Sequence, residues 1–134
     1  MALYAFGQGR EVGVDVEKIS RNVDELAIAR RMFAQSEVQQ LEALQGDERT
    51  AAFFNSWTRL EALAKASGRG LGSISQGQIF LPQGTAEANP VAANDGPGLE
   101  AGWPVISLQP GWGYAGAVAA KGTDWKVLCL EWLH

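Results

Sequence analysis

Three carboxylates and one lysine are the residues in this sequence whose types and spacing could do chemistry. Asp15 and Glu17, in the segment GVDVE, alternate along a predicted strand, so they share one of its faces, with Cα atoms roughly 6.5–7 Å apart. Glu61 and Lys65, in WTRLEALAKASGRGL, lie one turn apart on a predicted helix. If that strand and helix meet, the four side chains suit a divalent cation and a bound phosphate.

Each pair also has a simpler explanation. Asp15 and Glu17 are what the solvent-facing side of an edge strand would carry, with the alternate valines pointing inward. Glu61 and Lys65 are spaced as a surface ion pair worth about 0.2–0.5 kcal/mol on a helix. Taken one pair at a time, the simpler explanation is favoured. The glycine run after Lys65 is a modest sign against it, because glycine lets backbone approach a ligand closely.

Length and composition indicate a single globular domain over 1–134. The chain has 134 residues, 46% of them hydrophobic and 19% charged, which suits one hydrophobic core. No apolar run is long enough to span a membrane and no secretory signal pattern is visible, so we expect no membrane association. The net charge of −4 disfavours a nucleic-acid partner.

Cysteine and histidine usage narrows the chemistry further. Cys129 is the one cysteine, and its apolar surroundings, WKVLCLEWL, predict a buried structural thiol. A chain without a disulfide pair fits a reducing compartment, so we expect a cytoplasmic location. His134 is the one histidine, which excludes a histidine-based triad or a histidine-rich zinc site inside this chain.

Two strands and a first helix are predicted at the start of the chain. ALYAF (2–6) and EVGVDVEKI (11–19) are typical of strands, and the tight turn between them indicates a hairpin. After the second strand, Asn22 or Asp24 can cap a helix.

Two further helices are predicted to follow. Ser36 can cap a short helix that runs through Leu44, with Gln39 completing a capping box. The longest helix spans about 47–67 and ends at Gly68. This long helix carries the Glu61–Lys65 spacing and an apolar stripe at helical period.

The second half of the chain is predicted to be strands and loops. QIFLP (78–82) is strand-like, and 85–102 contains little to bury, so we expect a mobile loop there. Three closing strands are predicted at 105–109, 114–120 and 125–133. Helices between strands of this kind favour an α+β fold, with an antiparallel sheet packed against a long helix and shorter helices.

Three motifs in this order resemble the C-terminal half of the Sfp-type 4'-phosphopantetheinyl transferases. They are GVDVE, MFAQSE and FFNSWTRLEALAKASGRGL, set against the family patterns G-[IV]-D-[IVL]-E, F-[SA]-x-x-E and W-[ST]-x-K-E-A-x-x-K-x-x-G-x-G-L. The later GYAGAVAA is similar to a strand usual near the family's C-terminus. The resemblance covers about 2–120 and implies one half of the family's pseudo-dimer fold.

The resemblance implies a reaction and a metal site. Family members move the phosphopantetheine arm of coenzyme A onto a serine of an acyl or peptidyl carrier protein, release 3',5'-ADP and require magnesium (Mg²⁺). By position, Asp15, Glu17 and Glu61 would hold the cation, and Glu61 would also count as a catalytic residue. Carboxylate and pyrophosphate oxygens are the usual ligands of this metal.

The remaining family positions imply contacts with coenzyme A and a base. Lys65 would contact the phosphates and act in catalysis, and Gly68 and Gly70 would lie against coenzyme A. Glu37, from MFAQSE, or Glu17 would accept the proton of the carrier serine.

Two departures from the family pattern qualify this resemblance. Leu60 stands where the family often has lysine, and Arg59 is about 100° away around the helix, so it does not replace that contact. The family's first half, with its basic groups for the nucleotide phosphates, has no counterpart in the chain. We therefore expect an isolated half with weak or no activity, or a homo-oligomer that rebuilds the pocket.

A non-catalytic module that binds a carrier protein is the alternative. Met32 and Phe33 are flanked by the basic residues Lys18, Arg21, Arg30 and Arg31, which predicts a basic rim around an apolar spot. Carrier proteins are commonly acidic, so such a rim would steer them despite the net negative charge.

Overall fold

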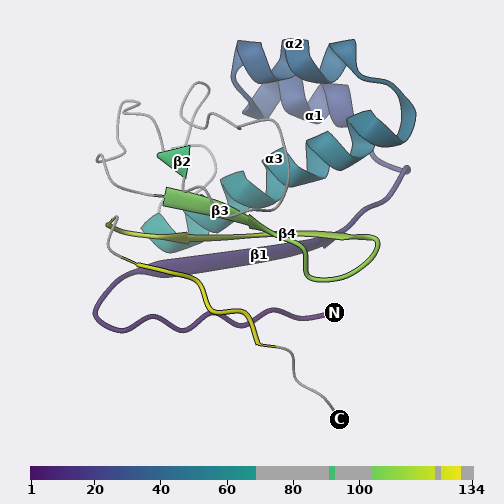
Figure 1. Cartoon of the computed structure of the whole chain (residues 1–134). Helices are drawn as coiled ribbons and strands as arrows, with labels where there is room; N and C mark the ends of the chain where they lie inside the picture. Colours follow the sequence, from purple (N-terminus) through teal and green to yellow (C-terminus); the bar gives the residue numbers. More distant parts are fainter. Residues whose placement is uncertain (69–90, 93–103, 123–124, 131–134) are drawn as a thin grey trace.

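A computed structural model of the chain describes residues 1–68, 91–92, 104–122 and 125–130 (Figure 1). Helices and strands within these residues are β1 (Val12–Lys18), α1 (Glu25–Met32), α2 (Gln35–Ala43), α3 (Gly46–Ser67), β2 (Val91–Ala92), β3 (Pro104–Leu108) and β4 (Tyr114–Ala120).

The strands form one antiparallel sheet in the order β1-β4-β3-β2. Helix α3 runs along one face of this sheet. Helices α1 and α2 pack against the N-terminal half of α3, on the side of α3 that faces away from the sheet (Figure 1). The residues before β1 run over the other face, where Leu3 lies against Gly116 of β4. The predicted α+β fold, with an antiparallel sheet packed against a long helix and shorter helices, is confirmed.

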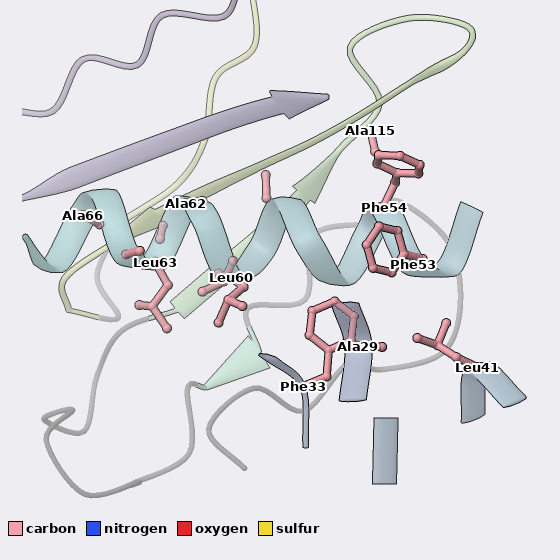
Figure 2. Packing of buried hydrophobic residues seen from close by; sticks show 14 of the residues in the cluster. Ala29, Phe33, Leu41, Phe53, Phe54, Leu60, Ala62, Leu63, Ala66 and Ala115 are labelled. Carbon is pink, nitrogen blue, oxygen red and sulfur yellow. The ribbon is translucent and has the colours of Figure 1, made fainter. Parts of the chain in front are cut away.

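Helix α3 is the centre of the hydrophobic core (Figure 2). Its side chains are buried on nearly all sides, because the sheet covers one side and the two shorter helices cover another. Phe53 packs edge-on against Phe54 and contacts Phe33 at the end of α1. Toward the sheet, β4 presents alanines, and these small side chains let α3 lie close to the strands.

Two of the three helix ends predicted from capping residues are found in the structure. Asp24 caps α1, since its Oδ1 accepts a hydrogen bond from the Ala27 N–H at 3.2 Å. Gly68 ends α3 with a left-handed backbone, φ +69°. The prediction that Ser36 caps α2 is wrong, because α2 already begins at Gln35, with Ala34 at the N-cap and no side-chain hydrogen bond there.

The strand predicted at 2–6 is wrong, and so is the hairpin. Residues 2–6 form no strand, and Phe6 is 94% exposed. β1 pairs instead with β4, from Val12 opposite Ala120 to Lys18 opposite Tyr114. A partner about 100 residues away in sequence, rather than the adjacent segment, therefore satisfies the backbone of β1.

The last strand prediction is also wrong where the structure describes it. Residues 125–130 form no strand, and Leu128 and Leu130 are exposed. Cys129 is exposed as well, so the predicted burial of this thiol is corrected. The cause is the same in each case: no element of the described chain covers this apolar segment.

The predictions at 105–109 and 114–120 are confirmed by β3 and β4. The two-residue strand β2 lies inside 85–102, where a loop was predicted, and pairs with the start of β3. The other residues of that segment, and the predicted strand at 78–82, lie outside the described residues. None of the described helices is long and apolar enough to cross a membrane.

Candidate cation and phosphate site

The inward face of β1 carries the first acid of the predicted site. Gly13 and Asp15 are buried against α3, while the valines that alternate with them lie on the opposite face of the sheet. Asp15 is only 6% exposed. The simpler explanation for GVDVE, with acids outside and valines inside, is therefore wrong for Asp15.

Lys65 of α3 is bonded directly to this buried acid. Its Nζ donates to Asp15 Oδ1 at 2.8 Å and to the Val14 carbonyl at 3.3 Å. The lysine is half-exposed, so its charged end lies between the buried carboxylate and solvent. The other oxygen, Asp15 Oδ2, is buried and has no hydrogen-bond partner among the described residues.

Glu17 and Glu61 complete a group of interacting charges. Burial raises the pKa of Glu17, and the charges of Asp15 and then Glu61 raise it further. Burial also raises the pKa of Glu61, with Asp15 again adding to the shift. The hydrogen bond to Asp15 raises the pKa of Lys65. Asp15, Glu17, Glu61 and Lys65 therefore form one electrostatic unit, here called the acid cluster.

The acid cluster fits a hard divalent cation by its chemistry. Its donors are carboxylate oxygens, one of them buried without a partner, and their mutual repulsion is what a bound cation would relieve. In the described part of the chain, no three His, Cys, Asp or Glu side chains lie in an arrangement that could by itself hold a metal ion. Substrate oxygens would have to complete the shell, as magnesium sites commonly require.

Glu37 lies in a different environment. This α2 residue is 7% exposed, and burial raises its pKa to about 7, which the nearby Arg59 partly opposes. None of the acids in the acid cluster shifts the pKa of Glu37. The structure thus brings Asp15, Glu17, Glu61 and Lys65 together and leaves Glu37 beside Arg59.

Arg59 is the functional candidate that the sequence motifs did not single out. It is 4% exposed, and burial lowers its pKa to about 10, which Glu37 partly opposes. Its Nη1 donates to Ser107 Oγ at 2.8 Å and its Nη2 to the Val105 carbonyl at 3.0 Å. A charged residue inside an apolar helix is the one sequence signal that could have drawn attention to it.

The predicted carrier-binding rim is only partly at the surface. Arg30 forms an exposed ion pair with Glu42 at 3.2 Å, and Arg31 is exposed. Phe33 is buried in the core, so it cannot belong to a docking surface. Of the two predicted coenzyme A glycines, Gly68 ends α3, and Gly70 lies outside the described residues.

Comparison with known proteins gives the family. The family model "4'-phosphopantetheinyl transferase superfamily" matches residues 11–119. The chain, with its α+β fold and its acid cluster, therefore belongs to the 4'-phosphopantetheinyl transferase superfamily.

Individual relatives agree with this assignment. The chain is 45% identical over 67 residues to the slr0495 protein of Synechocystis sp., covering 49% of this chain and 27% of that protein. It is 29% identical over 126 residues to the 4'-phosphopantetheinyl transferase HetI of Nostoc sp., covering 94% of this chain and 50% of HetI. The chain thus spans half or less of the length of these curated relatives.

A solved structure supports the fold. The holo-[acyl-carrier-protein] synthase of Thermotoga maritima matches with a TM-score of 0.55 and 18% identity, covering 85% of this chain and 64% of that one. At this identity the likeness concerns the fold alone.

Proposed function

We propose that this chain supplies the cation- and phosphate-binding half of a magnesium-dependent transferase. That enzyme would move 4'-phosphopantetheine from coenzyme A to a serine of an acyl or peptidyl carrier protein and release 3',5'-ADP. The observation that carries the proposal is the 2.8 Å bond from Lys65 Nζ to the buried Asp15 Oδ1, with Glu17 and Glu61 close enough to repel Asp15. Family membership and the HetI match support the reaction class.

The acid cluster would divide its work between a cation and the phosphates. Asp15, Glu17 and Glu61 would hold Mg²⁺, which when bound supplies positive charge to offset that of the pyrophosphate. Lys65 has three donor hydrogens, and its bonds to Asp15 and to the Val14 carbonyl use two of them, while the half-exposed end of the side chain faces solvent. The third donor would bind a phosphate oxygen of coenzyme A.

The chemical step needs a proton acceptor for the carrier serine. The serine oxygen forms a bond to the phosphorus that carries pantetheine, the bond from that phosphorus to the 3',5'-ADP oxygen breaks, and the serine proton passes to a carboxylate. Glu17 is favoured over Glu37 for this role because Glu17 is partly exposed within the acid cluster, whereas Glu37 is buried beside Arg59.

The rest of the pocket would come from a second half. The chain spans half of HetI, and several apolar side chains of its terminal segments are exposed, namely Tyr4, Phe6, Leu128 and Leu130. Such side chains fit contact with another polypeptide. We propose that a partner half, or a second copy in a homo-oligomer, completes the coenzyme A site, and that the protein acts in the cytoplasm.

Intact-mass analysis tests the reaction. An apo carrier protein is incubated with this chain, coenzyme A and magnesium, with and without the N-terminal half of HetI. The proposal predicts a gain of one phosphopantetheine arm in at least one of these mixtures, lost in Asp15→Ala and Glu61→Ala and kept in the surface control Glu42→Gln. Absence of any gain in both mixtures would refute the transferase assignment for this chain.

A further inference from the structure

Arg59 joins helix α3 to the sheet on the side away from the acid cluster. Its guanidinium is buried and bonds Ser107 Oγ and the Val105 carbonyl, both on β3. At 3.6 residues per turn, Arg59 and Glu61 point about 200° apart around the helix. Arg59 therefore reaches β3, whereas Lys65, one turn after Glu61, reaches Asp15 on β1.

The strand register connects the two sides. Ser107 of β3 lies opposite Ala117 of β4, and Ala117 lies opposite Asp15 of β1. One row across the sheet therefore contains an acceptor of Arg59 at one end and the acceptor of Lys65 at the other. With strands 4.7–4.9 Å apart, the two ends of this row are about 10 Å from each other.

Two positively charged side chains of α3, Arg59 and Lys65, are thus hydrogen-bonded to the two ends of this row of residues. Ala117, in the middle of the row, is fully buried. A rotation of α3 about its axis that moved Lys65 away from Asp15 would have to stretch the bonds of Arg59 as well. A buried guanidinium resists this, because leaving its donors unpaired costs more than an ordinary hydrogen bond.

Glu37 supplies the charge on the remaining side of Arg59. It approaches from α2, and each of the two groups shifts the pKa of the other in the direction of the charged state. Glu37 Oε1 and Arg59 Nε are both buried and have no hydrogen-bond partner among the described residues. The guanidinium is therefore held by two bonds to β3 and by the field of one carboxylate.

We propose that Arg59 is a positioning residue for the acid cluster. By tying α3 to β3 on one side of the helix, its guanidinium holds Glu61 and Lys65 against β1 on the other side. The geometric part of this inference is independent of any reaction, and the cation-affinity part rests on the proposed function.

Nuclear Overhauser contacts of Lys65 test the positioning without any ligand. The chain has four lysines, so selective lysine labelling resolves the Lys65 side chain. We expect the contacts from the Lys65 ε-protons to Val14 and Asp15 to be lost in Arg59→Met. Ser107→Ala, which removes one acceptor and keeps the charge, should weaken them. This milder variant carries the test if Arg59→Met does not fold.

Arg49→Met is the matched control. Arg49 is also on α3, and its Nε donates to the Leu41 and Leu44 carbonyls at 2.9 Å each, so it ties the helix to the end of α2 rather than to the sheet. We expect Arg49→Met to lower the Tm and to leave the Lys65 contacts in place. Unchanged Lys65 contacts in folded Arg59→Met or Ser107→Ala, with a lowered Tm alone, would overturn the positioning role.

Mn²⁺ titration of the same proteins measures the consequence for the site. Removing a residue that orients metal ligands commonly costs 10–100-fold in affinity, so we expect Mn²⁺ to bind about 10-fold more weakly to Arg59→Met. Arg59→Lys should recover part of the loss, and Arg49→Met should match the wild type. If the wild-type chain binds no Mn²⁺, the proposed function fails, and the Lys65 contacts still decide the positioning role.

Discussion

Gly13 of β1 lies so close to α3 that a Cβ at this position would stand 2.3 Å from the Ala66 backbone nitrogen. The same Cβ would stand 2.3 Å from the Ala62 carbonyl oxygen. Both neighbours are backbone atoms of a buried helix, so neither can move away through a change of side-chain rotamer. This close approach brings the strand that carries Asp15 within reach of Lys65.

Gly13→Ala should therefore separate β1 from α3. We expect the free energy of unfolding to fall by about 1–3 kcal/mol, as is usual when a side chain is forced into a packed interface. Gly7→Ala is the control, because a Cβ there would meet its neighbours at an ordinary 3.5 Å. Urea unfolding of both variants measures the difference. Equal stability of the two would contradict the close approach.

Asp15 and Lys65 should be energetically coupled. Lys65→Met leaves the buried carboxylate of Asp15 without its cation, whereas the same change in an Asp15→Asn background leaves only a neutral amide. A double-mutant cycle by urea unfolding should give a coupling energy of about 0.5–3 kcal/mol. Strictly additive effects would mean that the 2.8 Å bond contributes nothing to stability.

Glu37 should make stability depend on pH. Its pKa is about 7 in the folded protein and near 4.5 when unfolded, so between these values the folded state holds a proton that the unfolded state has released. Stability from this group is therefore lost as pH rises from 4.5 to 7, by about 3 kcal/mol in total. Because Glu37→Gln lacks this titrating group, its free energy of unfolding should rise relative to that of the wild type between pH 4.5 and 7, as measured by urea titrations. Parallel curves for the two proteins would contradict the burial of this acid.

Leu60→Lys should not restore the family's usual lysine contact. Leu60 is 4% exposed and belongs to the core around α3, so a lysine there would place its charge among apolar side chains. We expect a loss of about 2 kcal/mol or more in the free energy of unfolding, with no tighter binding of coenzyme A. An unchanged Tm together with stronger coenzyme A binding would show that residue 60 can reach the phosphates.

The sequence predicts the elements of this fold better than their partners. Alternation in GVDVE correctly assigns Asp15 and the valines to opposite faces of a strand, because a period of two is a local property. Which face meets α3 depends on segments far along the chain. For the same reason the local hairpin at 2–6 is wrong, since β1 pairs with β4, about 100 residues away.

Some residues of the candidate site can likewise be predicted from the sequence, and others cannot. Glu61 and Lys65 can be predicted from helical spacing, and the motif order predicts that they meet Asp15. The burial of Arg59 cannot be predicted from local sequence, because its acceptors on β3 lie 46 and 48 residues further along the chain. A charged residue on a helix is expected at the surface until the fold supplies buried partners for it.

Direct Mn²⁺ binding, followed by the loss of the free-ion electron paramagnetic resonance signal, tests the central claim that Asp15, Glu17 and Glu61 form one cation site. We predict that the wild-type chain binds one Mn²⁺, and that Asp15→Asn and Glu61→Gln each weaken binding by about 10-fold or more. The surface variant Glu42→Gln should bind as the wild type does. A wild-type chain that binds no Mn²⁺, or acid-cluster variants that bind it as well as Glu42→Gln, would contradict the claim.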